Sequence, residues 1–439
     1  MTPDHSVAPR ERVHFVYKPP TESLTEFVEL PFKILVMGDY TRRPDERPLE
    51  ERKPVPVDPD TFDHVLAAHG LALADLQALE ASWRGLKYLV DHVDFRENIR
   101  VEVLAVSKED LFEDFDESPG VTSSGLYHLV YRRPYDTFDG KPYGLLVGDY
   151  EFDNSPRDIA LLRKIASVAA MAHAPFITGT APTMFGLATW EGLPDLENLK
   201  GLFAEPGYAP WREFRASEEA RYVGLCLPRV LFAQGVWGSA AFALAARIAD
   251  SFAQYRWCPN ILGPTGGVIA QGPTEVRLSE RRAHELAEEG FIGPVFRADS
   301  PAACFLFASS CQQPRYFGTS KEGREAATHD YLCAQLPYAF VVNRLAHYLK
   351  VQARDQTGVW MERVDFERGL HAWLAQYVAD MDDPRPSIRA RRPLRAASVT
   401  VEDVTGQPGW WRLHLRVRPH FKYMGAYFTL SLVGMIDKR

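Results

Sequence analysis

The stretch YGLLVGDYEFDNSPRDIALLRKIASVAAMAHAPFITGT, residues 143–180, decides the fold class. It begins with an apolar run at residues 143–147, of the kind found in strands that are covered on both faces. The letters SPRD at residues 155–158 then have the composition of a helix start, with Ser as N-cap and Pro at the first helical position. Apolar residues continue at helical spacing, and residues 175–180 form a second short strand. This order predicts a buried sheet with helices on its faces.

Upstream segments extend the same alternation of strands and helices. Residues 32–38 form an apolar run that predicts another buried strand. Over residues 76–93 the apolar residues recur at helical spacing, and residues 99–106 form a further predicted strand. Ser107 and Asp110 predict a capping box for the helix that follows.

The segment at residues 41–60 has a different composition. It contains five prolines and eleven charged residues, and proline can neither donate to a strand ladder nor continue a helix. We therefore expect an ordered loop or a linker here, without a regular element.

The second half of the chain changes from helices to strands. Helices are predicted at residues 239–255, 279–289 and 337–357. Beyond them, apolar and polar residues alternate, which predicts a three-stranded unit at the C-terminus. The alternating apolar positions are Val399 and Val401, then Leu413, Leu415 and Val417, then Phe428, Leu430 and Leu432.

A short alternating segment near the start of the sequence predicts one more strand. Within residues 12–18, Val13, Phe15 and Tyr17 share one face. Together these elements predict an α/β protein with mixed sheets, helices on their faces, and terminal strands with which another chain could pair. The predicted parts are an N-terminal segment, an α/β body and a C-terminal unit, at residues 1–66, 67–395 and 396–439.

Composition and charge narrow the class of protein. The 439 residues are 46% hydrophobic and 25% charged, as in typical globular proteins. The net charge of −8 argues against a protein whose main role is to bind nucleic acid. No apolar run reaches the roughly 18 to 20 residues of a bilayer span, and the first residues lack the apolar stretch of a signal peptide. We expect a cytoplasmic protein without membrane insertion.

No metal or cofactor site is predicted. The five cysteines never form C-x-x-C, so we expect reduced and mostly buried thiols. The glycine cluster at residues 263–267 lacks the lysine of a phosphate-binding loop and is interpreted as a turn. His284 lacks the second histidine of a zinc-binding helix, and His414 and His420 have no cysteine or acidic partner nearby in the sequence.

No catalytic constellation is evident either. His173 lies in an apolar context and is interpreted as a hydrogen-bonded core histidine. The acidic residues within 109–117 are interpreted as a solvated helix face rather than as an acid–base pair. We therefore expect that the protein is not an enzyme.

Two stretches resemble different proteins of one machine, the contractile sheath of the bacterial type VI secretion system. Residues 11–66 resemble the N-terminal part of the small sheath subunit (TssB or VipA type), through RVHFVY, ELPFKILVMGDYTRRPDERPLEERKPVPVD and TFDHVL. Residues 76–435 resemble the large sheath subunit (TssC or VipB type). The matching segments include LEASWRGLKYLVD, residues 143–177, EEARYVGLCLPRVL, GPTEVRLSERRAHELAEEGFI, LAHYLKVQARDQTG, RRPLRAASVTVEDV and RPHF.

The resemblance implies a fused, sheath-type subunit. In the family, terminal strands of neighbouring subunits interlace into shared sheets, so the implied main partner is the protein itself. An Hcp-type inner tube and baseplate proteins are further implied partners. The small-subunit part lacks its helical second half, and the large-subunit part lacks the helix that the unfoldase ClpV grips in the family. Recycling by ClpV is therefore not expected.

Three functional hypotheses follow. The first is a self-assembling sheath subunit that polymerises by exchange of β-strands between chains, although the first strand could instead pair within its own chain. The donated strand would carry Val13, Phe15 and Tyr17, and the receiving sheet Leu413, Leu415, Val417, Phe428, Leu430 and Leu432. The second is a non-contracting closed ring or shell built from the same fold. The third is a small-molecule-binding protein or an enzyme that reuses an α/β fold.

Overall fold

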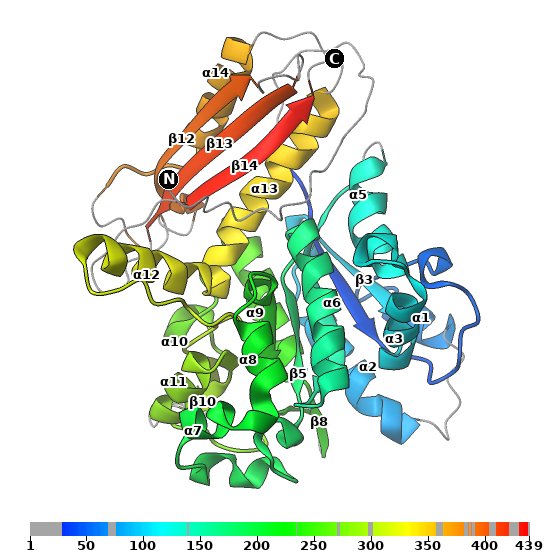
Figure 1. The fold of residues 1–439 in the computed structure, drawn as a ribbon. Coiled ribbons are helices and arrows are strands. Elements are labelled where there is room, and N and C mark those ends of the chain that lie inside the picture. Colours follow the sequence, from blue (N-terminus) through cyan, green and yellow to red (C-terminus); the bar gives the residue numbers. More distant parts are fainter. Residues whose placement is uncertain are drawn as a thin grey trace.

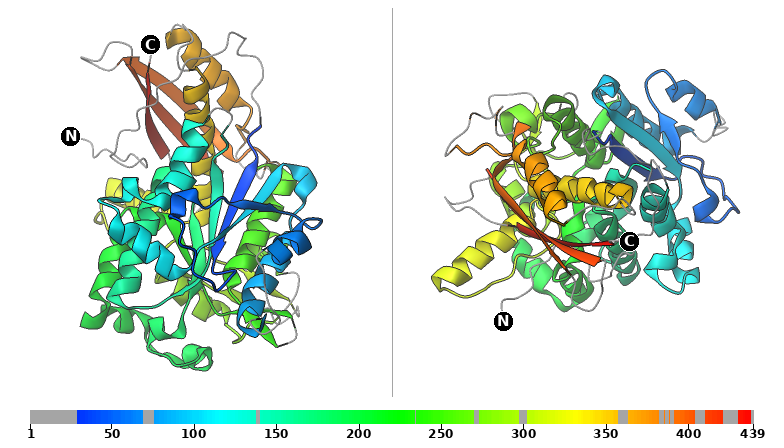
Figure 2. Two further views of the ribbon diagram at one scale, coloured as in Figure 1. Left: turned by 90° about the vertical axis from the view of Figure 1, so that its right-hand side faces the viewer. Right: turned by 90° about the horizontal axis from the view of Figure 1, so that it is seen from above.

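The computed structural model shows an α/β body that carries a C-terminal unit at one end (Figures 1 and 2). A seven-stranded sheet forms the centre of the body, and a three-stranded sheet forms the C-terminal unit. The structure describes residues 29–68, 76–137, 140–233, 235–269, 273–296, 302–356, 363–381, 385, 388, 391–403, 410–420 and 430–437.

The central sheet has the strand order β2-β3-β1-β4-β5-β6-β9. Neighbouring strands run parallel except for β2, which is antiparallel to β3. The strands are β1 Phe32–Gly38, β2 Val55–Val57, β3 Ile99–Ala105, β4 Tyr143–Phe152, β5 Phe176–Thr180, β6 Val223–Cys226 and β9 Phe291–Ile292. Parallel strands that are covered on both faces need apolar residues at successive positions. In β1, Ile34, Leu35, Val36 and Met37 are accordingly all inaccessible to solvent.

The predicted strands of the body are confirmed, with one difference in length. β1 has the predicted bounds, and the strands predicted at residues 99–106 and 175–180 correspond to β3 and β5. The strand predicted at residues 143–147 continues to Phe152. Its pairing with β5 is irregular between Gly148 and Glu151 and resumes at Glu151 and Phe152. The second part of the strand is therefore defined by its pairing with β5.

Residues 41–60 contain a strand that the sequence analysis did not predict. In β2, Val55 lies opposite Val103 and Val57 lies opposite Val101 of β3. Pro56 is compatible with this strand because β2 lies at the edge of the sheet, where alternate N–H groups need no ladder partner. The expectation of a segment without regular structure was therefore wrong at these three residues.

Helices cover both faces of the central sheet (Figure 1). α6 contributes to the hydrophobic core on one face, whereas α2 and α9 pack together on the other. The longer helices are α2 Leu76–Asp91, α3 Lys108–Glu117, α6 Pro156–Ala172, α9 Ala240–Tyr255, α11 Glu280–Glu288, α12 Lys321–Cys333, α13 Leu336–Gln356 and α14 Arg363–Ala375.

Short elements fill the connections. The short helices are α1 Phe62–Ala68, α4 Gly125–Tyr127, the π-helical turn His128–Arg132, α5 Arg133–Asp136, α7 Leu199–Ala204, α8 Ala209–Arg215 and α10 Gly263–Gly266. The short strands are β7 Val230–Ala233, β8 Val236–Gly238, β10 Pro294–Phe296 and β11 Ala303–Phe305. The predicted turn at residues 263–267 is thus the single helical turn α10.

The predicted helix starts are confirmed by their hydrogen bonds. The hydroxyl oxygens of Ser107, Ser155, Ser239 and Ser279 each accept a backbone N–H from the first helical turn, at 3.0–3.2 Å. Asp110 completes the predicted capping box by accepting the N–H of Ser107 at 2.7 Å. These side chains satisfy backbone donors that have no partner inside the helix.

The acidic segment of α3 is only partly a solvated face, which corrects the expectation. Asp110 accepts hydrogen bonds from the Arg52 guanidinium at 3.0 and 3.3 Å. Asp114 accepts the N–H groups of Gly125 and Leu126 at 2.6 and 3.1 Å. Arg52 is 58 residues from Asp110 in the sequence, so spacing along the helix could not reveal this partner. The two carboxylates attach other segments of the body to α3.

The C-terminal unit confirms the three strands predicted from alternation. They are β12 Leu394–Asp403, β13 Trp410–Pro419 and β14 Leu430–Asp437, and they form an antiparallel sheet in the order β12-β13-β14. Helices α13 and α14 lie behind one face of this sheet (Figure 1) and share a hydrophobic core with it.

Candidate assembly interface

The C-terminal sheet contains the described part of the predicted assembly site. Leu413, Leu415 and Val417 of β13 are 2%, 0% and 1% exposed. They belong to a core that includes Val341 and Leu345 of α13 and Trp373 of α14. These three residues therefore support the sheet from the inside.

The register of the sheet brings predicted residues of two strands together. Leu415 lies opposite Leu432, and Val417 lies opposite Leu430. Phe428 and the three residues of the predicted donor strand, Val13, Phe15 and Tyr17, lie outside the described residues. The structure therefore shows the apolar register of the sheet but does not place its predicted partner strand.

The strand order determines where another strand could be added. β13 is the central strand and pairs with β12 on one side and β14 on the other. Its backbone ladders are thus occupied, and only the outer edges of β12 and β14 can accept a further strand. Sequence alternation identified the strands but not this order.

The described chain begins next to the C-terminal unit. Leu30 is 2% exposed and packs in the core of that unit, although β1, which starts two residues later, belongs to the central sheet. Arg344 of α13 donates hydrogen bonds to the carbonyl oxygens of Leu30 and Pro31, and Glu29 forms an ion pair with Arg256 at 3.2 Å. The first described residues therefore lie beside α13.

α13 joins the C-terminal unit to the body through the side chains of basic residues. His347 contacts the carbonyl oxygen of Ala172 through Nε2 at 3.0 Å, and Lys350 donates to the carbonyl oxygen of Met171 at 2.9 Å. Arg354 donates to three carbonyl oxygens, at residues 134, 137 and 140, over 3.0–3.2 Å. Met171 and Ala172 end α6, where the carbonyl oxygens have no partner inside the helix, so these contacts satisfy them.

The sequence analysis missed these basic residues of α13, although the sequence contains a signal for them. Arg344, His347, Lys350 and Arg354 recur every three or four residues along a helix whose other buried positions are mostly apolar. Such a stripe places the four side chains on one face of the helix. A row of basic residues on a mostly buried helix indicates polar partners in another part of the chain.

Burial lowers the pKa of two of the residues that join α13 to the body. It lowers the pKa of His347 to about 3 and the pKa of Lys350 to about 7. His173, the residue that caps α6, has its pKa lowered mainly by burial and further by Lys350 and His347. His173 is 1% exposed and its Nδ1 lies 3.3 Å from the Tyr222 hydroxyl, which confirms the interpretation as a core histidine.

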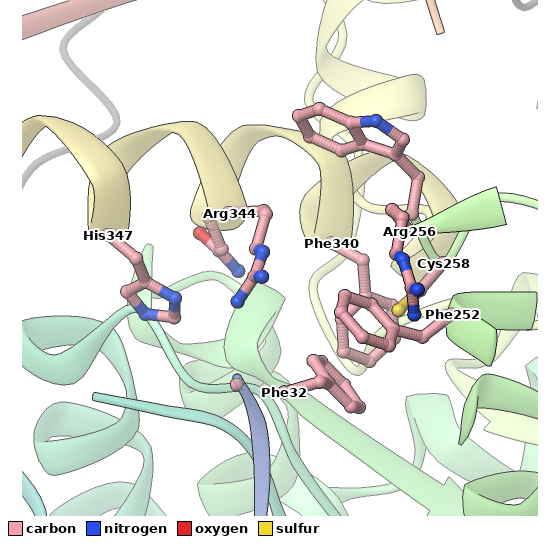
Figure 3. Close-up of a pocket in the computed structure, with 10 residues that line it drawn as sticks. Phe32, Phe252, Arg256, Cys258, Phe340, Arg344 and His347 are labelled. Carbon is pink, nitrogen blue, oxygen red and sulfur yellow. The ribbon is translucent and has the colours of Figure 1, made fainter. Parts of the chain in front are cut away.

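A narrow pocket lies at the same joint, between α13 and the start of β1 (Figure 3). Arg344 and His347 project from α13 toward it, and the rings of Phe32 and Phe252 form its apolar side. The space that water can reach inside is about 10 Å³, which is close to the minimum for one water molecule. A metabolite would need a cavity of several hundred cubic ångströms.

Other chemical sites have little support among the described residues. All five cysteines are buried and free, and burial raises the pKa of Cys311 and Cys333 to about 12. No group of three or more His, Cys, Asp or Glu side chains in the described part of the chain could hold a metal ion. None of its described helices combines the length and the apolar character needed to cross a bilayer.

Three protein-family descriptions match nearly the whole chain. The VipB tail sheath N-terminal domain matches residues 68–235 and 232–312, and the VipB tail sheath gpW/gp25-like domain matches residues 325–436. The VipA family of the type VI secretion system matches residues 5–77.

One curated relative and two solved structures are similar to this chain. The chain is 34% identical over 476 aligned positions to the type VI secretion system sheath protein TssC1 of Pseudomonas aeruginosa, which covers 96% of this chain and 93% of the relative. A sheath tail protein from Desulfitobacterium hafniense has a similar fold, with a TM-score of 0.50, 9% identity, and coverage of 95% of this chain and 99% of that chain. The contracted sheath of an extracellular contractile injection system gives a TM-score of 0.46 at 8% identity, over 97% and 96% of the two chains.

The α/β body and the C-terminal sheet, together with tail sheath matches over most of the chain, define a tail sheath protein. The chain belongs to the VipB family of type VI secretion sheath proteins and carries a VipA-type segment at residues 5–77. The relatives that it matches are described as sheath proteins.

Proposed function

We propose that copies of this sheath subunit polymerise by exchange of β-strands. Residues 12–18 of one copy would add to the C-terminal sheet of a neighbour, with Val13, Phe15 and Tyr17 on the apolar face. The N-terminal segment (1–66) would donate, the C-terminal unit (396–439) would receive, and the body (67–395) would stack against its neighbours.

The observation that carries this proposal is the small, open C-terminal sheet. It has only three strands among the described residues, and its inner face is already packed on α13 and α14. A strand added at an edge gains a complete backbone ladder, and its apolar side chains can extend an existing core. The alternating residues 12–18 have the matching pattern.

Deletion of residues 1–20 tests the proposal. We expect the variant to keep its fold, because β1 and all later described elements remain, but to lose assembly on electron micrographs. A sharper variant replaces Val13, Phe15 and Tyr17 together with Asn. Its matched control replaces Arg12, His14 and Lys18 with Asn, which alters the other face of the same segment. Assembly by the deletion variant would rule out exchange of this strand.

A closed, non-contracting particle is a second candidate. The VipA-type and VipB-type matches overlap at residues 68–77 of one chain, so each copy would carry both a donor and a receiver. A head-to-tail contact of this kind gives a ring if its rotation closes and a filament if it does not. Micrographs before and after mild denaturant distinguish the two, because a contractile sheath should shorten and widen whereas a closed particle should only dissociate.

Further partners and the cellular location follow from the same proposal. An Hcp-type inner tube and baseplate proteins would bind the assembled form, and the assembly would be cytoplasmic. Co-sedimentation of assembled particles with a purified tube protein tests the first partner. Sedimentation of the deletion variant under the same conditions is the control, since it should leave the tube protein in the supernatant.

A further inference from the structure

We propose that the narrow pocket between α13 and the start of β1 binds one structural water molecule. The water would accept hydrogen bonds from Asn343 and Arg344 and donate one to His347. The site lies within one copy of the chain and concerns how α13 is attached to the body, so it does not depend on the proposed strand exchange.

Three buried polar atoms of α13 have no hydrogen-bond partner in the described part of the chain. They are Asn343 Nδ2, Arg344 Nε and His347 Nδ1. The three residues line the pocket (Figure 3) and are 3%, 6% and 1% exposed. His347 is a neighbour of the other two on the helix surface, because they precede it by four and three residues. Buried polar groups are rarely left without a partner, and an ordered water commonly satisfies them.

Other bonds hold these three side chains in place. Arg344 donates through Nη1 and Nη2 to carbonyl oxygens just before β1. His347 Nε2 lies 3.0 Å from the carbonyl oxygen of Ala172, and the side chain of Asn343 hydrogen-bonds to His173. A side chain that turned toward another partner would give up one of these bonds. The three unpaired atoms therefore need a partner that enters the pocket.

The hydrogen bonds of His347 determine which molecule fits. A carbonyl oxygen can only accept, so Nε2 carries the ring proton that is donated to Ala172. Burial lowers the pKa of His347 to about 3, so the ring is neutral at pH 7 and its Nδ1 is an acceptor. The bound molecule must donate to Nδ1 and accept from the N–H groups of Asn343 and Arg344. Water does both, whereas a chloride ion only accepts.

The size and lining of the pocket agree with a single water molecule. The space inside is about 10 Å³, enough for one water. On the apolar side, the rings of Phe32 and Phe252 stack at a centroid distance of 5.0 Å and contribute no polar atom. Buried waters typically make about three hydrogen bonds. The three unpaired atoms of α13 provide that number.

A water at this point links two separate attachments of α13. Arg344 holds the segment before β1, while Asn343 and His347 hold the C-terminal end of α6. The shared water couples these contacts, because a movement of one side chain breaks a hydrogen bond on which the others also depend. It also holds His347 in the tautomer that donates to Ala172.

A density map of the purified chain, at a resolution that shows ordered waters, tests the proposal. The expected result is a peak within about 2.7–3.2 Å of Asn343 Nδ2, Arg344 Nε and His347 Nδ1. Absence of this peak, or a direct hydrogen bond between Asn343 and His347, would overturn it. Crystals grown with bromide in place of chloride separate water from an anion, because an anomalous peak at the site would show that an anion binds there instead.

The protonation of the His347 ring gives a second test. Nitrogen NMR of protein with isotope-labelled histidine distinguishes a proton on Nε2 from a proton on Nδ1, and the spectrum of His347→Gln identifies the signals of this residue. We expect a neutral ring with its proton on Nε2. A proton on Nδ1 would contradict the proposal, because that atom would then need an acceptor.

A variant of Arg344 tests the role of its Nε atom. Arg344→Lys keeps a positive charge for the carbonyl oxygens before β1 but has no Nε, so we expect the water peak to lose most of its height. The matched control is Arg354→Lys, on the same helix, because Arg354 also donates to carbonyl oxygens but does not line the pocket. An unchanged peak in Arg344→Lys, or an equal loss in both variants, would show that Nε does not hold the water and would overturn the assignment.

Discussion

At the scale of single residues, Arg52 shows how one side chain can order a proline-rich segment. Its guanidinium binds Asp110 and the carbonyl oxygens of Asp45 and Arg47, and its side chain is only 8% exposed. Arg52→Ala should lower the free energy of unfolding by about 2–4 kcal/mol, because Asp110 loses its charge partner and two carbonyl groups lose their donor. Urea denaturation of the purified protein measures this change.

A neighbouring arginine provides the control for this prediction. Arg47 pairs with Asp45 at 2.7 Å, but its side chain is 64% exposed. Arg47→Ala should therefore change the stability by no more than about 0.5 kcal/mol. Equal losses in the two variants would mean that the charge of the segment matters, and that the partners of Arg52 do not.

The buried Lys350 should make the stability of the protein depend on pH. Burial lowers its pKa to about 7, so between pH 7 and 10.5 the unfolded chain binds a proton that the folded chain does not. This lysine therefore makes the protein less stable as the pH falls from 10.5 towards 7. Lys350→Met should remove that loss. Between pH 9.5 and pH 7 we expect the stability of the variant, relative to wild type, to rise by about 1–2 kcal/mol, because part of the residue still reaches solvent.

Lys164 is the matched control for the pH series. It also lies on the body, but its side chain is 34% exposed and pairs with Asp116 at 2.7 Å. Urea midpoints of Lys164→Met should follow the wild type in parallel from pH 7 to pH 9.5. If the urea midpoints of Lys350→Met also run parallel to those of the wild type, the ammonium group of Lys350 in the wild type is as well solvated in the folded protein as in the unfolded chain.

At the scale of elements, Gly85 determines how closely α2 and α9 can pack. A Cβ atom at Gly85 would lie 2.5 Å from Cδ2 of Phe242, a ring with no exposed surface. Gly85→Ala should destabilise the protein by about 1–3 kcal/mol through overpacking, despite a helix-propensity gain of about 1 kcal/mol. Gly369→Ala in α14 is the control, because nothing lies within 4 Å of its added Cβ, and it should stabilise the protein slightly. Thermal unfolding of both variants gives the comparison.

Elements with local signals were predictable from the sequence, and elements with distant partners were not. Helix starts such as Ser107 and Ser155 are encoded within one turn, since the cap and the N–H that it accepts are three residues apart. β2 exists because β3 provides a ladder 46 residues away, and its prolines obscure it locally. The same limit applies to the candidate site: alternation indicated β13 and β14, but the hydrogen bond from the Val401 N–H to Glu367 depends on α14, 34 residues earlier.

At the scale of the whole molecule, α13 holds two parts of the protein together, and two of its joining residues, His347 and Lys350, have lowered pKa values. His347 is 1% exposed, and its ring centroid lies 6.4 Å from that of His173. The charged groups that face it are Arg344 and Lys350, both on α13, and both disfavour a second positive charge. Below pH 6.5 the unfolded chain, or a form in which α13 leaves the body, binds a proton that the packed form excludes. Acid should therefore weaken the attachment of the C-terminal unit.

His347→Gln tests this attachment, because Gln keeps a donor for the carbonyl oxygen of Ala172 but does not titrate. The pKa of His347 is lowered from 6.5 to about 3, so the wild type should lose about 2 kcal/mol between pH 6.5 and pH 5 that the variant keeps. Urea midpoints at pH 7.5 and pH 5 measure the difference. His284→Gln, at an exposed position on α11, should behave as the wild type at both values. An equal acid loss in all three proteins would show that protonation of His347 does not weaken the protein, and that other groups account for the acid sensitivity.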